Sequence, residues 1–108
     1  MKTQIIINET HTLMKDQVRV LDKRFGPDGW TAYPVPEKGW TLKEIEALAW
    51  GMTGFTIVFA SPVPALLLKV AQNNPKNTFV LHNDCRVAKE LPGGRIIHTV
   101  APEGWVLV

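Results

Sequence analysis

Short blocks of apolar residues alternate along the chain with longer mixed patterns. Four of the blocks are rich in β-branched and aromatic residues and are bounded by polar or turn-forming residues, which is typical of strands. They cover residues 4–7, 30–35, 55–60 and 78–81. The first contains Ile5, Ile6 and Ile7 in a row and predicts a strand buried on both faces, as in a parallel sheet. Pro34 places the second at a sheet edge or ends it early, because proline cannot donate a hydrogen bond to a neighbouring strand.

Between these blocks, apolar residues recur at intervals of three and four, which predicts three helices. The helices are expected over residues 13–25, 42–52 and 62–73, with Thr12, Thr41 and Ser61 as their N-caps. Thr41 and Glu44 also fit a capping box, in which each side chain bonds the backbone N–H of the other residue. The third helix is apolar nearly all round, so it either lies deep against the sheet or forms a subunit interface.

The alternation of strands and helices predicts an α/β fold with parallel strands joined through helices. We expect one Rossmann-like domain over residues 1–108, a three-layer sandwich with four parallel strands in the order 2-1-3-4. Residues 86–91 and 95–100 flank a Pro-Gly-Gly turn and predict a C-terminal β-hairpin. This hairpin either extends one edge of the sheet or reaches out to a partner. Residues 105–108 add a short terminal strand.

Composition narrows the classes of partner and cofactor. The 108 residues are 45% hydrophobic, carry a formal net charge of +2 and contain no run of more than two Lys or Arg. This charge pattern disfavours duplex DNA or a membrane surface as the main partner. No apolar stretch approaches the roughly 20 residues that a membrane span needs, so we expect a cytoplasmic protein. The single cysteine, Cys85, provides neither an internal disulfide nor a metal framework, and we expect no metal and no cofactor.

Polar residues follow three of the predicted parallel strands, where ligands bind in open α/β sheets. The expected site residues are Asn8, Thr10 and His11 after the first strand, Ser61 after the third, and His82, Asn83 and Arg86 after the fourth. Neither Gly-x-Gly-x-x-Gly nor Gly-x-x-x-x-Gly-Lys-Ser/Thr occurs in the chain, which argues against a conventional dinucleotide or P-loop site.

Four of these residues also have a plain structural interpretation. Ser61 either caps the third helix or, with the free amides of the helix start, binds an anion, and it can do both. His11 is a proton donor or a solvated loop residue, and His82 either binds a ligand or orders the strand end. Arg86 suits a bidentate phosphate contact but equally an ion pair with a nearby carboxylate. Trp105 either stacks on a base or anchors a dimer contact.

The residues after the first strand resemble a known family. Thr10-His11-Thr12-Leu13, followed by Gln17, is similar to the N-terminal pattern of small CRISPR-associated and phage-encoded proteins related to the CARF superfamily. Met14 stands where that pattern usually has a threonine. Two further segments look like these proteins: Phe-Ala-Ser-Pro-Val-Pro at residues 59–64 and the closing turn Glu-Leu-Pro-Gly-Gly-Arg at residues 90–95.

The resemblance implies a dimeric, Rossmann-like protein that binds or cleaves cyclic oligoadenylate second messengers without a metal. In that reaction a ribose 2′-hydroxyl attacks the adjacent phosphate and leaves a 2′,3′-cyclic phosphate. His11 and Arg86 would stabilise charge or protonate the leaving oxygen, and Asn8, Thr10 and Ser61 would position the ligand. The alternative is a non-enzymatic phage or defence-associated protein, which sequesters a nucleotide or docks on another protein through the apolar third helix.

Overall fold

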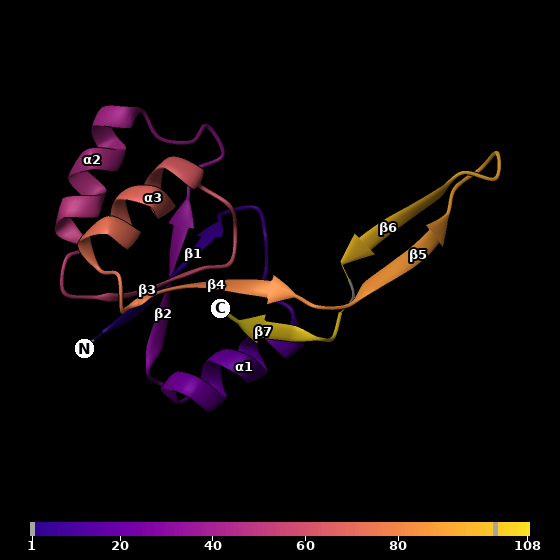
Figure 1. Ribbon diagram of the computed structural model, residues 1–108, viewed down its shortest axis with the longest axis horizontal. Helices are drawn as coiled ribbons and strands as arrows, with labels where there is room; N and C mark the ends of the chain where they lie inside the picture. Colours follow the sequence, from indigo (N-terminus) through magenta and orange to yellow (C-terminus); the bar gives the residue numbers. More distant parts are fainter. Residues whose placement is uncertain (1, 101) are drawn as a thin grey trace.

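The computed structural model of the chain describes residues 2–100 and 102–108; for Arg86, Val87, Lys89 and residues 98–100 it describes the backbone alone. Five strands form one mostly parallel sheet in the order β2-β1-β3-β4-β7 (Figure 1). Their bounds are β1 Thr3–Asn8, β2 Trp30–Val35, β3 Thr56–Phe59, β4 Thr78–Asn83 and β7 Trp105–Leu107. The first four pair in parallel with one another in the predicted order 2-1-3-4, and β7 pairs antiparallel with β4.

The burial of the strands follows from their sequences. In β1 the side chains of Ile5 and Ile6 point to opposite faces and both are fully buried, as the unbroken apolar run predicts. All four residues of β3 are buried as well. The edge strand β2 contains Pro34, and its side chains are mostly exposed. The centre of the sheet is therefore the pair β1 and β3.

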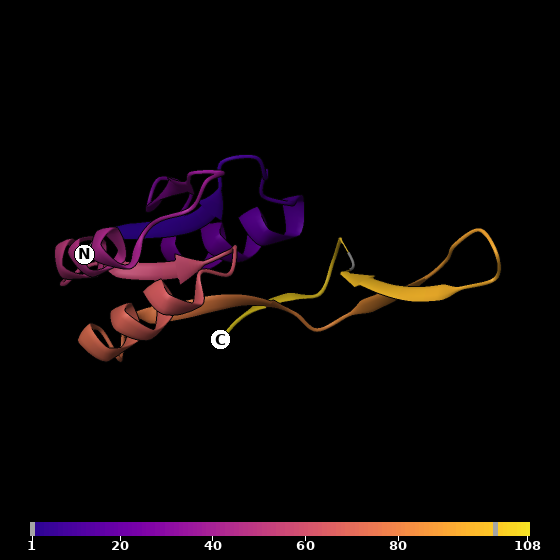
Figure 2. The same cartoon turned by 90° about the horizontal axis from the view of Figure 1, so that it is seen from above.

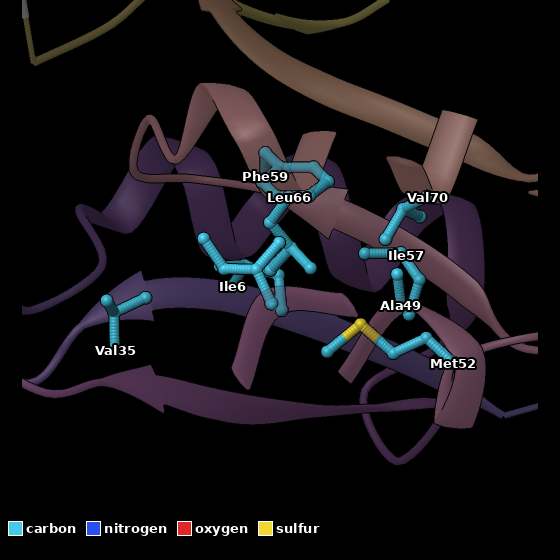
Figure 3. Packing of buried hydrophobic residues seen from close by; sticks show 9 residues of the cluster. Ile6, Val35, Ala49, Met52, Ile57, Phe59, Leu66 and Val70 are labelled. Atoms are coloured by element: carbon cyan, nitrogen blue, oxygen red, sulfur yellow. The ribbon is translucent and has the colours of Figure 1, made fainter. Parts of the chain in front are cut away.

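Helices cover both faces of this pair. α1 (Lys15–Phe25) packs Leu21 against Ile5 and Val58 on one face. α2 (Leu42–Gly51) and α3 (Pro64–Asn73) lie on the other face, where their residues meet Ile6, Ile57 and Phe59 (Figure 3). Figure 1 shows α1 on the opposite side of the sheet from α2 and α3. The fold is thus α/β, with two apolar cores separated by the sheet.

α3 packs against the sheet through only part of its apolar surface. Leu66 and Val70 are fully buried, whereas Leu68 remains 62% exposed. The helix therefore packs on the sheet, which is one of the two placements that its composition predicts, and keeps an apolar residue at the surface.

Two of the three predicted N-caps are wrong. The capping box of α2 is confirmed, because Thr41 and Glu44 exchange hydrogen bonds of 3.0 and 3.2 Å. α1 starts later than predicted, with Met14 as N-cap instead of Thr12. Gln17 provides the physical reason, because its Oε1 accepts from the Met14 N–H at 2.8 Å, whereas the residue three after Thr12 is a lysine and has no acceptor.

α3 also begins later than predicted, and Ser61 does not cap it. Its N-cap is Val63 and its first residue is Pro64. A residue that precedes proline is pushed away from helical dihedral angles, and Val63 lies at φ −133° and ψ 81°. Pro64, and not Pro62, therefore determines where α3 starts. Ser61 lies before this start and has another role.

The predicted hairpin forms and stands away from the sheet. β5 (Arg86–Glu90) and β6 (Ile96–Val100) pair antiparallel in a separate two-stranded sheet. Figures 1 and 2 show it projecting from the end of β4, and the molecule measures 48 × 32 × 22 Å. Of the two predicted placements, extension of the sheet is wrong, because β5 and β6 pair only with each other and β7 occupies the edge beside β4. No helix within the described residues is long and apolar enough to cross a membrane.

Candidate functional site

The strand order reverses between β1 and β3. The chain leaves β1 through α1 on one face and leaves β3 through α3 on the other, so the connections that follow these two paired strands diverge. Open α/β sheets bind ligands in the crevice formed at such a switch point. A hollow of about 430 Å³ lies here. It is lined by Ile7, Thr10, His11, Thr12, Met14, Gln17, Ala60, Ser61 and Trp105.

Ser61 joins the two strand ends. Its side chain is 3% exposed, and its Oγ accepts from the backbone N–H of Asn8 at 2.9 Å. The Ser61 N–H in turn donates to the carbonyl oxygen of Ile6 at 3.0 Å. Ser61 thus holds β3 against β1 directly below the hollow. Asn8 contributes to this link through its backbone and does not line the hollow.

The loop after β1 presents Thr10 and His11 at the mouth of the hollow. The His11 N–H donates to the carbonyl oxygen of Asn8 at 2.9 Å and closes a tight turn. Glu9 anchors the loop on the other side, because its Oε1 accepts from the Glu37 N–H at 2.8 Å. Thr10 and His11 are both exposed. The structure therefore brings together Thr10, His11 and Ser61, three of the residues predicted from the sequence.

The last strand, β7, contributes Trp105 to the wall of the hollow, although it lies far from β1 and β3 in the sequence. The backbone N–H of Trp105 donates to Asp16 Oδ2 at 3.0 Å, and Arg19 Nε donates to Asp16 Oδ1 at 2.7 Å. The hydrogen bond from Arg19, and then the one from Trp105, lower the pKa of Asp16 below its ordinary value. A charged carboxylate at the start of α1 thus fixes β7 and places the indole of Trp105 in the wall of the hollow.

The hollow also has an inner wall, formed by Gln17 and Trp105, that the sequence did not place with Thr10, His11 and Ser61. Gln17 is 6% exposed and Trp105 is 9% exposed, and both line the hollow. The indole N–H of Trp105 is buried and meets no acceptor among the described residues. Asp16 gives no sequence signal for its role, because its contact with Trp105 joins residues 89 positions apart.

The predicted site residues His82 and Asn83 belong to β4, which extends to Asn83, and they lie elsewhere. His82 is exposed on β4, and its Nε2 is 3.5 Å from Asp84 Oδ1. Asn83 is buried, and its Nδ2 donates to the carbonyl oxygen of Glu103 at 3.0 Å, which holds the turn that leads into β7. Neither residue lines the hollow, because β4 lies on the far side of β3 from β1. The predicted role of the Arg86 side chain falls outside the described part of the chain.

A second, larger depression adjoins the hollow. This groove of about 900 Å³ runs between the start of α1 and the turn before β7. Its lining consists of Leu13, Met14, Lys15, Asp16, Arg19, Pro102, Glu103 and Gly104. Met14 lines both depressions, so they meet at its side chain. The described side chains include no cluster of three or more His, Cys, Asp or Glu that could hold a metal ion.

Comparisons of the chain with protein-family models, with curated proteins and with solved structures find no match. The resemblance to proteins related to the CARF superfamily therefore rests on the residues of this chain alone.

Proposed function

We propose that this chain binds a nucleotide ligand of the cyclic oligoadenylate class in the hollow between the ends of β1 and β3. One observation carries the proposal: the hollow lies at the switch point of the sheet and gathers Thr10, His11 and Ser61. In this proposal the fold works in the Rossmann-like manner, with the ligand at the carboxyl edge of the sheet.

The chemistry of the lining suits a phosphodiester at the mouth. Thr10, Thr12 and His11 offer hydroxyl and imidazole groups, and no Lys or Arg occurs among the described lining residues. A diester carries one negative charge for each phosphate, which neutral donors can bind when they are held in place. The volume of about 430 Å³ is near the lower end of the range for small-molecule sites, roughly 300–1,000 Å³. One hollow therefore holds part of a ring, and two copies related by a two-fold axis would hold a whole one.

Cleavage forms the second part of the proposal. The ribose 2′-oxygen would attack the adjacent phosphorus, and the bond from phosphorus to the 5′-oxygen would break. The 2′-hydroxyl gives its proton to solvent and the leaving 5′-oxygen takes one up, so the step consumes no water. His11 lies at the mouth of the hollow, and an imidazole transfers protons near neutral pH. We therefore assign protonation of the leaving oxygen to His11.

Calorimetric titration with cyclic tri-, tetra- and hexa-adenylate in buffer containing EDTA tests binding, and chromatography of the same samples tests cleavage. We expect His11→Ala to abolish cleavage and to weaken binding of the ring that binds. His82→Ala is the matched control, because this exposed histidine lies outside the hollow, and it should behave as wild type. Light scattering of the complex should show a dimer.

Absence of heat with all three rings would refute the proposal. Binding without cleavage would remove the catalytic role of His11 and support the alternative, a protein that sequesters the nucleotide.

A further inference from the structure

The inner wall of the hollow differs from its mouth. Thr10 and His11 at the mouth are exposed, whereas Gln17 and Trp105 are at least nine-tenths buried. Ile7, which is also buried, adds an apolar surface to the lining. A charged phosphate is costly to bury without a cation, and a flat base is not. A nucleotide that enters this hollow is therefore expected to place its base inward and its phosphate at the mouth.

The side-chain amide of Gln17 uses its oxygen to cap α1. Its Oε1 accepts from the Met14 N–H at 2.8 Å, which fixes the orientation of the amide. This is the hydrogen bond that the described structure gives the Gln17 side chain, and it leaves the Nε2 amino group uncommitted to the helix cap. An amide oxygen has two lone pairs, so Oε1 can accept a second hydrogen bond. Gln17 lines the hollow, and its amide carries a donor and an acceptor side by side.

Trp105 adds a second donor to the same wall. Its buried indole N–H meets no acceptor within residues 2–100 and 102–108. This N–H is closed off from solvent, so the inference rests on Gln17, which also lines the hollow.

We infer that Gln17 reads the base of the bound nucleotide and selects adenine. A glutamine amide pairs with adenine through two hydrogen bonds, because it accepts from the 6-amino group and donates to a neighbouring ring nitrogen. Hypoxanthine has a carbonyl at position 6, which would face Oε1 with an acceptor instead of a donor. The inference rests on the proposed function, because it assumes that the hollow binds a nucleotide.

The test compares adenosine and inosine 5′-monophosphates, which differ in the base and carry the same phosphate. Nuclear magnetic resonance titrations give the ratio of their dissociation constants. We expect the wild type to prefer the adenine nucleotide by about tenfold or more, as one bidentate pair provides roughly 1–3 kcal/mol of discrimination. The side-chain amide signals of Gln17 should shift with the adenine nucleotide, and this readout needs no variant.

Gln17→Glu keeps the acceptor for the Met14 N–H and removes the donor, so the start of α1 is retained. Its added charge affects both nucleotides alike, and the ratio should fall toward one. Gln72→Glu is the matched control, because Gln72 is exposed on α3 and outside the hollow, and it should keep the ratio of the wild type.

The two proposals fail in different ways. If neither nucleotide nor any cyclic oligoadenylate binds, the proposed function fails and the inference with it. If cyclic oligoadenylate binds at the hollow but the wild-type ratio is near one, or the amide signals of Gln17 stay in place, the inference alone is overturned. A ratio that Gln17→Glu leaves unchanged overturns it as well.

Discussion

Replacement of Ser61 by alanine distinguishes two roles of this residue: a link between β1 and β3, which the structure shows, and a cap of α3, which the sequence suggests. The structure uses Ser61 Oγ as the acceptor for the Asn8 N–H, which joins β1 to β3. The sequence Ser-Pro predicts instead that Ser61 caps α3, whereas the cap is Val63. Both roles would make Ser61→Ala destabilising, so the location of the damage is the quantity to measure.

The magnitude follows from the hydrogen bond that is lost. Ser61→Ala leaves the partly buried Asn8 N–H without its acceptor, and an unsatisfied buried donor costs about 1–3 kcal/mol. The melting temperature should therefore fall by at least about 4 °C, since a domain of this size loses about 4–8 °C for each kcal/mol. Thr10→Ala is a control of similar chemistry, because Thr10 is exposed in the loop after β1, and its effect should stay within about 0.5 kcal/mol.

Amide hydrogen exchange locates the effect. In Ser61→Ala the protection of the Asn8 amide should fall by roughly 5- to 150-fold, which corresponds to 1–3 kcal/mol. The protection of the Leu67 amide, which donates to the carbonyl oxygen of Val63 in the first turn of α3, should fall no further than that of the Asn8 amide, because it falls through global stability alone. Selective loss of protection at Leu67, with Asn8 unchanged, would refute the assignment and restore the helix-cap role.

Two further predictions concern the turn before β7 and its anchor. In urea unfolding, Gly104→Ala should destabilise the chain more than Gly39→Ala. Both glycines have a positive φ, so both changes strain the backbone. However, a Cβ at Gly104 would lie 2.6 Å from Cys85 Sγ, whereas one at Gly39 would meet no atom within 4 Å. Equal losses would contradict the predicted clash. The lowered pKa of Asp16 stabilises the folded state above its ordinary pKa of 3.8, and this contribution is lost as the pH falls through the lowered value. Asp16→Asn should therefore be less stable than wild type at pH 7, with a gap that narrows in acid; parallel stability curves would show that Asp16 contributes nothing through its charge.

The sheet could be predicted well because its signals are local. The run Ile5–Ile7 has no polar face, so it fits a buried central strand and little else. Thr41 and Glu44 cap α2 with side chains three residues apart, which a short window of sequence contains. The start of α3 was predicted wrongly because two prolines compete there, and Pro64 restricts Val63 more strongly than Ser61 favours a cap.

The site could be predicted in part. Thr10, His11 and Ser61 meet because the carboxyl ends of neighbouring parallel strands share one edge of the sheet. Gln17 and Trp105 complete the hollow from other elements, and their approach depends on the distant contact between the start of α1 and β7. No pattern within a short stretch of sequence contains that contact.

A titration of the ¹⁵N-labelled chain with cyclic tetra-adenylate, followed by nuclear magnetic resonance, tests the central claim most directly. Binding at the switch point predicts that the amide shifts concentrate at residues 7–14, at Ala60 and Ser61, and at Trp105 with its indole N–H. Shifts that gather instead around the exposed Trp50 of α2, or spectra that do not change at millimolar ligand, would contradict it.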